Sequence, residues 1–239
     1  MSGAQPVAVS AARLAIAAAI LLAVALVKRT SDRAPTSHEN MVFAFAGIAL
    51  AVHFVTWIWS LQYISVAVST LLVATTPIWT ALYDARFKHR SFTRLTLAGF
   101  ILGAAGLVCV VSTVRTSAPI AGHIFLGALL AFSGSLAIGA YFLMVREVRD
   151  AFGTRTIVTR TYAWAAAVLI IASILLRQAP PAIDDGAAWA GIIGMALISQ
   201  LVGHTALNAA LRWFSPSAVA FATLLEPVFA GVLAWAIFH

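Results

Sequence analysis

The segment 61–89 reads LQYISVAVSTLLVATTPIWTALYDARFKH, and the segment 211–239 follows the same plan 150 positions later as LRWFSPSAVAFATLLEPVFAGVLAWAIFH. In both, an aromatic residue and a serine open the segment, and a proline interrupts the apolar run behind them. Repeats that each contain an interrupted hydrophobic segment are typical of secondary transporters. The identical pairs at this offset are Leu61 and Leu211, Ser65 and Ser215, Pro77 and Pro227, and His89 and His239.

The composition indicates a membrane protein. Hydrophobic residues make up 62% of the chain and charged residues 10%, and the mean hydropathy is +0.97. A soluble domain is about half apolar and a quarter charged, so lipid is the solvent for most of this chain. The single cysteine, Cys109, excludes a disulfide framework and a thiolate metal cluster.

The apolar runs predict an all-α polytopic membrane protein with about eight membrane spans. Each run approaches the roughly 20 residues that cross a hydrocarbon core. The first run is not a signal peptide, because it lacks a basic leader and contains Arg13. The predicted spans are 6–27, 42–62, 66–86, 95–114, 121–144, 156–177, 187–209 and 216–238.

The net charge of +7 is distributed as membrane topology requires, and it does not indicate nucleic-acid binding. Twelve of the 15 Lys and Arg residues lie in four alternate links between spans, while only Arg115 and Arg177 lie in the opposite links. By the positive-inside rule, the links 28–40, 84–94 and 145–156 are cytoplasmic. The twelve residues are Lys28, Arg29, Arg33, Arg86, Lys88, Arg90, Arg94, Arg146, Arg149, Arg155, Arg160 and Arg212.

The 150-residue offset also predicts the domain organisation. It pairs the first three predicted spans with the last three, so two five-helix repeats require ten helices, of which this chain contains helices two to nine. Residues 1–115 form the first repeat (helices two to five) and residues 116–239 the second (helices six to nine). An odd number of helices per repeat gives the two halves opposite orientations in the membrane.

Four stretches together resemble the EamA-type branch of the drug/metabolite transporter superfamily. RLAIAAAILLAVAL, with Arg13, is similar to that family's second helix, and HFVTWIWSLQYISVAVSTLLVATTPIWTALY to its third and fourth. LTLAGFILGAAGLVCVV is similar to its fifth, with a G-x3-G spacing for close helix packing. GHTALNAALRWFSPSAVAFATLLEPVFAGVLAWAIF, with the Leu-Glu-Pro triplet 225–227, resembles its eighth and ninth.

The resemblance implies ten helices in a five-plus-five inverted repeat, a central cavity, and export of small metabolites or amino acids. Two features depart from the family pattern. The first and last helices are apparently lacking, and the neighbourhood 87–90 reads Phe-Lys-His-Arg where the family usually has a Glu after its fourth helix.

Three polar residues in the span 187–209, namely Gln200, His204 and Asn208, are spaced i, i+4, i+8. This spacing places them on one face of a helix. Polar groups within a membrane require a partner or a wet cavity. The stripe therefore either lines the substrate path or hydrogen-bonds to a neighbouring helix.

His53 and Trp57 form a second i, i+4 pair, in the span 42–62. They offer a titratable donor beside an aromatic wall, which suits an aromatic or amphipathic substrate or a proton relay. Alternatively, a backbone carbonyl satisfies His53, and Trp57 and Trp59 face lipid. Together with the stripe, the pair is expected to reach one central, partly hydrated pocket.

Glu226, expected near the wall of that pocket, is the one acid placed well inside a span. It either exchanges a proton during transport or makes a structural hydrogen bond where Pro227 breaks its helix. A proline lacks an N–H group, so Pro227 and Pro77 each leave the carbonyl four residues earlier without its usual partner. Arg13 is expected to pair helices or to extend its charge toward the membrane surface.

No nucleotide loop, zinc-type ligand set or catalytic triad is present, so no enzyme activity, cofactor or metal is expected. The sequence predicts a multi-pass protein of the bacterial inner membrane that transports a small molecule by alternating access. A non-transporting fragment or partner subunit, which completes its bundle by forming a homo-oligomer, remains the alternative. The expected partners are the lipid bilayer and a small-molecule substrate, and no nucleic acid.

Overall fold

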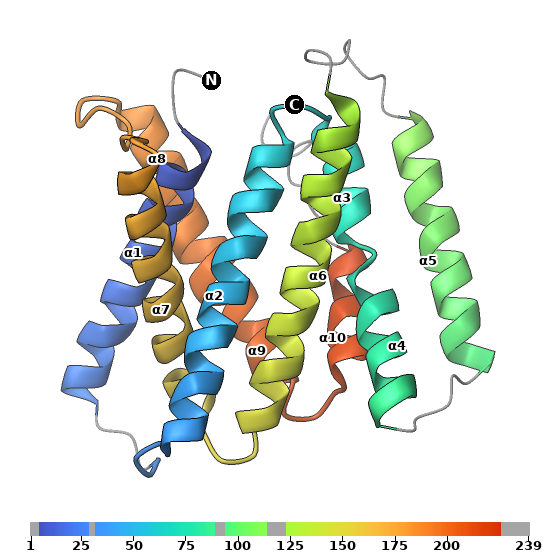
Figure 1. Cartoon of the computed structure of the whole chain (residues 1–239), viewed down its shortest axis with the longest axis horizontal. Coiled ribbons are helices and arrows are strands. Elements are labelled where there is room, and N and C mark those ends of the chain that lie inside the picture. The colour runs from blue at the N-terminus through green and yellow to red at the C-terminus, as the bar shows by residue number, and fades with distance from the viewer. Residues whose placement is uncertain (1–4, 29–31, 89–93, 114–122, 226–239) are drawn as a thin grey trace.

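The computed structural model describes residues 5–28, 32–88, 94–113 and 123–225, and this part of the chain is a bundle of helices without strands (Figure 1). Six helical segments in it are long and apolar enough to cross a membrane. They are Pro6–Val27, Ser37–Ser60, Val66–Phe87, Ile124–Val148, Thr154–Leu175 and Gly186–Ala210. The protein is therefore a multi-pass helical membrane protein.

Most predicted spans coincide with helices. Helices α1 (Pro6–Val27), α5 (Arg94–Thr113) and α7 (Thr154–Leu175) start and end within two residues of the expected limits. Helices α6 (Ile124–Val148) and α2 (Ser37–Ser60) are shifted further. Of the last predicted span, the structure describes only α10 (Pro216–Ala222) and the 3-10 turn η2 (Thr223–Leu225).

The predicted start of α2 at residue 42 is wrong by five residues, because a capping box begins the helix earlier. The hydroxyl of Thr36 accepts a hydrogen bond from the Glu39 backbone N–H at 3.3 Å, and the Glu39 carboxylate accepts one from the Thr36 N–H at 2.8 Å. This reciprocal pair satisfies two N–H groups at the helix start. The polar first turn therefore extends the helix beyond the apolar run.

The span around Pro77 is broken into α3 (Val66–Val73) and α4 (Thr76–Phe87). The hydroxyl of Thr76 donates to the Val73 carbonyl at 2.7 Å and so replaces the N–H that Pro77 lacks. The hydroxyls of Thr75 and Thr76 also lie 2.9 and 3.1 Å from the Ser135 hydroxyl on α6. The break is thus closed by side chains and fastened to α6.

The turns that open the two repeated segments have the same local structure. Ser65 caps α3 by accepting from the Val68 N–H at 3.3 Å, and Ser215 caps α10 by accepting from the Ala218 N–H at 3.2 Å. They lie at opposite ends of α6. The Ser65 turn packs where Gly127 starts that helix, and the Ser215 turn shares a hollow with the other end.

The described basic residues of the four predicted cytoplasmic links gather at one end of the bundle (Figure 1). The carboxylate of Asp32 accepts from the Gly153 N–H at 3.0 Å, which joins two of these links. Arg149, only 4% exposed, donates to the Thr154 hydroxyl at 2.7 Å, and its burial lowers the pKa of the guanidinium. The charge asymmetry read from the sequence is therefore an asymmetry of the folded bundle.

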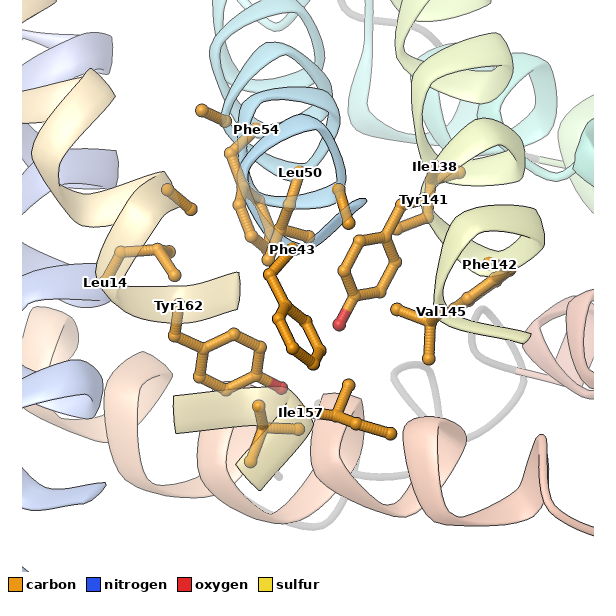
Figure 2. Packing of buried hydrophobic residues seen from close by; sticks show 14 of the residues in the cluster. Leu14, Phe43, Leu50, Phe54, Ile138, Tyr141, Phe142, Val145, Ile157 and Tyr162 are labelled. Carbon is orange, nitrogen blue, oxygen red and sulfur yellow. The ribbon is translucent and has the colours of Figure 1, made fainter. Parts of the chain in front are cut away.

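The packed core lies between α1, α2, α6 and α7, with Phe43 between Tyr141 and Tyr162 (Figure 2). All three rings are at most 1% exposed. Gly47 lets α2 approach α7 closely, because a methyl group there would overlap the Cβ of Trp164 and lie 2.8 Å from the Thr161 carbonyl. The core fixes α2 as the central helix of the bundle.

Candidate functional site

A small cavity lies near the middle of the bundle, where α1, α2, α3, α4 and α6 meet the π-helix η1 (Met195–His204), α9 (Thr205–Ala210) and η2. Its volume is about 70 Å³, enough for a few water molecules. Its lining side chains are Arg13, His53, Phe54, Trp57, Thr70, Val73, Thr76, Ile138, Phe142, Ser199, His204, Leu207 and Thr223.

His53 forms part of the wall and is held in a fixed orientation. It is 5% exposed, and its Nδ1 lies 2.9 Å from the Gly134 carbonyl on α6. A carbonyl only accepts, so Nδ1 carries the hydrogen, and in the neutral ring Nε2 is an acceptor. The ring stacks on Trp57 with centroids 6.1 Å apart and planes 5° apart. His53 thus has a backbone partner and also borders the cavity.

Trp57 of α2 and His204 of η1 both line the cavity, and each has a buried polar atom without a partner among the described residues. Neither the Trp57 Nε1 nor the His204 Nδ1 has a hydrogen-bond partner in the described structure, although both atoms are buried. The His204 ring packs edge-on against Phe54, with centroids 5.3 Å apart. Buried polar atoms in native proteins almost always have partners, so these two are expected to bond to water or a ligand in the cavity.

Arg13 places a positive charge at the same cavity. It is 2% exposed, its Nη2 donates to Gln200 Oε1 at 2.9 Å and to the Ser199 hydroxyl at 3.2 Å, and its guanidinium lies 4.2 Å from the centre of the Phe54 ring. Arg13 therefore pairs α1 with η1, as expected, and also lines the cavity. An arginine inside an apolar run is itself a signal of function, and sequence reasoning gave it too little weight.

The stripe of Gln200, His204 and Asn208 divides between different neighbours. Gln200 bonds to Arg13, whereas Asn208 accepts from the Tyr141 hydroxyl at 2.8 Å and donates to the His204 carbonyl at 2.7 Å. Of the three, only His204 lines the cavity. The π-helix contributes to this division, because its i→i+5 bonding changes the direction of successive side chains.

Two tyrosines that sequence reasoning missed contact the polar stripe through their hydroxyl groups. The Tyr141 hydroxyl binds Asn208, and the Tyr162 hydroxyl lies 3.4 Å from the Gln200 carbonyl and 3.5 Å from the Thr205 hydroxyl. Both tyrosines sit in the apolar core. The sequence did offer a signal for these two residues. A tyrosine inside a predicted span needs a hydrogen-bond partner for its hydroxyl group.

The helix break also borders the cavity, since Thr70, Val73 and Thr76 line it. Thr223 in η2 lines it from the second repeat and donates to the Ala220 carbonyl at 2.7 Å. Glu226 and Pro227 lie outside the described residues. The cavity thus receives side chains from both halves of the chain and from the segment interrupted at Pro77.

Comparisons with known proteins give one family match and a similar solved fold. The sequence pattern of the EamA-like transporter family matches residues 1–112 and 125–239. A solved structure described as "Crystal structure of protein" superposes with a TM-score of 0.79 at 18% sequence identity, covering 98% of this chain and 79% of that chain. At this identity the likeness shows the fold alone. No curated protein matches the chain by sequence.

Proposed function

Because the chain belongs to the EamA-like transporter family, we propose that it exports a small metabolite or amino acid across the bacterial inner membrane by alternating access through the central cavity. The observation that carries this proposal is that two residues lining the same cavity, Trp57 and His204, each have a buried polar atom, Nε1 and Nδ1, without a partner in the described structure. A polar atom without a protein partner can bond to water when the site is empty and to substrate when the site is filled. A transporter needs such an exchange, because it must release its substrate as well as hold it.

The lining suggests the chemistry of the substrate. Arg13 offers a cation, Trp57 an N–H donor, and the stacked rings of His53 and Trp57 an aromatic face. Cation and donor together suit a carboxylate, and the aromatic face suits an apolar side chain. A small molecule with one carboxylate end and one apolar end, as in an apolar amino acid, fits this arrangement.

The cavity must enlarge to admit such a molecule. Small-molecule sites usually measure roughly 300–1,000 Å³, and this cavity measures about 70 Å³. The break between α3 and α4 lies at the cavity wall and is fastened to Ser135 only by hydroxyl contacts. Discontinuous helices beside the site are the moving parts of many secondary transporters. We assign the opening motion to this break.

The arrangement of the two repeated turns is an argument for a mechanism in which one half of the chain moves against the other. Equivalent serine-capped turns stand at opposite ends of α6, as two repeats of opposite orientation would place them. In this scheme Gln200 and Asn208 hold the wall of the substrate path, while His53, Trp57 and His204 contact the substrate. Glu226 remains a candidate member of the path on sequence grounds.

The test is transport by the purified chain in proteoliposomes loaded with a panel of amino acids. Trp57→Phe and His204→Phe keep a ring in place and remove the polar atoms, and each should lower transport at least about tenfold, the usual value of a hydrogen bond to a charged group. Trp213→Phe and His123→Phe make the same changes at exposed positions and should leave transport unchanged.

The contrary outcomes are distinct. Normal transport by both cavity variants would remove the cavity from the substrate path. A wild-type chain that inserts and folds but transports nothing unless mixed with another chain would favour the non-transporting subunit instead.

A further inference from the structure

A second, larger hollow lies on the side of the bundle and shares no lining residue with the central cavity. It is an open groove of about 580 Å³ between the last turns of α1 and the first half of α7. These two helices run side by side (Figure 1). We call it the α1–α7 groove.

The α1–α7 groove changes from basic to apolar along its length. Lys28, which follows the last residue of α1, and Arg155 and Arg160, in the first two turns of α7, line its outer end. Leu22 and Trp164 line its inner end, and Trp164 lies about 14 Å along the helix from Arg155 at 1.5 Å per residue. The basic end lies where α1 ends and α7 begins, at the end of the bundle that the positive-inside rule assigns to the cytoplasmic surface.

The charges at the outer end are of one sign. Among the described residues that line the groove, three are cationic and none is acidic. Arg160 is held in position, since it donates to Asn40 Oδ1 at 3.2 Å and its guanidinium lies 5.7 Å from the Phe43 ring centre on α2. A cluster of cations beside an apolar wall favours a ligand with an anionic head and an apolar tail.

Thr159 supplies a second, independent indication of a ligand. It lies on α7 between Arg155 and Arg160, is 7% exposed, and lines the groove. Its hydroxyl is buried and has no hydrogen-bond partner in the part of the chain that the structure describes. An unsatisfied buried hydroxyl is costly, so a ligand with an oxygen acceptor at this depth would satisfy it.

We propose that the α1–α7 groove binds one anionic phospholipid. The headgroup phosphate lies against Lys28, Arg155 and Arg160, a glycerol ester oxygen accepts from the Thr159 hydroxyl, and an acyl chain runs along Leu22 and Trp164. The apolar residues lie farther from the basic end of the groove than Thr159 and the cations do, as an acyl chain lies farther from the headgroup than the ester oxygens do. This site is independent of the transport proposal, because it uses none of the residues of the central cavity.

The experiment uses the full chain in phosphatidylcholine nanodiscs and follows quenching of tryptophan fluorescence by phosphatidylglycerol brominated on its acyl chains. Brominated phosphatidylglycerol should quench a fraction of the emission at mole fractions where brominated phosphatidylcholine does not. Trp164→Phe should abolish that selective fraction, which assigns it to the groove among the seven tryptophans.

Charge and hydroxyl variants then test the assignment of each part. Lys28→Gln and Arg155→Gln should each weaken phosphatidylglycerol binding roughly fivefold, the usual worth of one basic residue near an anionic surface. Thr159→Val keeps the shape and removes the hydroxyl, so it should also weaken phosphatidylglycerol binding. The matched control is Lys88→Gln, an exposed lysine at the same end but outside the groove, which should change nothing.

Three results would overturn the proposal. Equal quenching by the two brominated lipids would make the groove part of the general lipid shell. Full competition by soluble glycerol phosphate would reveal a free-phosphate site. Loss of selective quenching as the chain self-associates, with Lys28→Gln and Arg155→Gln without effect, would identify a second copy as the occupant.

Discussion

The 150-residue offset in the sequence pairs helix α2 with the segment Gly186–Ala210, yet the structure builds the two differently. α2 is one uninterrupted α-helix of 24 residues. Its counterpart runs as α8 (Gly186–Gly194), then the π-helix η1, then α9. Each contributes one histidine, His53 or His204, to the same cavity.

The polar groups of the two segments differ in the same way. In α2, His53 bonds to the Gly134 carbonyl, the Thr56 hydroxyl donates to the Val52 carbonyl at 2.8 Å, and the hydroxyl of Ser60 lies 2.6 Å from that of Ser69. In η1, the buried Gln200 Nε2 and His204 Nδ1 have no partner among the described residues. In α2, Trp57 Nε1 is likewise buried without a partner among the described residues, so α2 has one unpaired polar atom of this kind and η1 has two.

Burial follows the same division. In the most apolar stretch of α2, 44% of the residues are buried, against 17% in Gly186–Ala210. Loosely packed elements open at lower free energy than core elements, and π-helical turns often mark functional sites. The comparison indicates a cavity with one fixed wall, α2, and one adjustable wall, η1.

The difference between the fixed wall and the adjustable wall can be tested by adding one methyl group to each segment. Among the tests of this contrast, it carries the largest expected change in stability. Gly47→Ala, on the fixed wall, should destabilise the protein by about 2 kcal/mol or more, because the new Cβ would overlap Trp164 and α2 or α7 must shift. Gly191→Ala, in α8, meets no atom within 4 Å and should stabilise its helix by up to about 1 kcal/mol. Thermal unfolding in one detergent measures both. Equal tolerance at the two sites would mean that α2 is not a fixed wall.

Much of this fold was predictable because its main signals are long and local. Apolar runs longer than 20 residues located the helices, and the lysines and arginines correctly predicted which links share one end. The start of α2 was missed because residues 37–40 are all polar and hydropathy does not register the Thr36–Glu39 cap. The interruption near Pro77 follows from the missing N–H, but its closure by Thr76 and Ser135 depends on a contact 59 residues away in sequence.

The site was less accessible to sequence reasoning, because helical spacing does not reveal which neighbour a face meets. The i, i+4, i+8 pattern grouped Gln200 with Asn208, whereas in the structure they contact α1 and α6 respectively. A π-helix leaves no clear mark in hydropathy, so its effect on side-chain direction could not be anticipated. Arg13 was visible in the sequence, but its approach to His204 and Trp57 requires the tertiary fold.

A smaller effect should separate support of the adjustable wall from substrate contact. Asn208→Ala and Tyr141→Phe each break the 2.8 Å bond between Asn208 and the Tyr141 hydroxyl, and each should cost about 1 kcal/mol of stability. The double variant should cost less than the sum of the two, with a coupling of about 0.6 kcal/mol, the average for such bonds in membranes. Unfolding in detergent gives the cycle, and Tyr83→Phe on an exposed ring is the control. Strict additivity would show that the bond does not support this wall.

The smallest expected effect concerns the two helix starts. Thr36 caps α2, and Asp185 caps α8 by accepting from the Ala188 N–H at 3.0 Å. Removing either cap should cost about 1 kcal/mol of helix stability. The cost should appear in different places, because α2 belongs to the packed core and α8 does not. Thr36→Ala should lower the global unfolding temperature by a few degrees. Asp185→Ala should leave that temperature nearly unchanged and raise amide hydrogen exchange about fivefold within 186–194 alone, since local opening costs less than global unfolding there.

Hydrogen exchange measured by mass spectrometry on both variants distinguishes local opening from global unfolding. If Asp185→Ala lowered the global temperature as much as Thr36→Ala, the two segments would unfold as one unit, and the difference between a fixed and an adjustable wall would be lost.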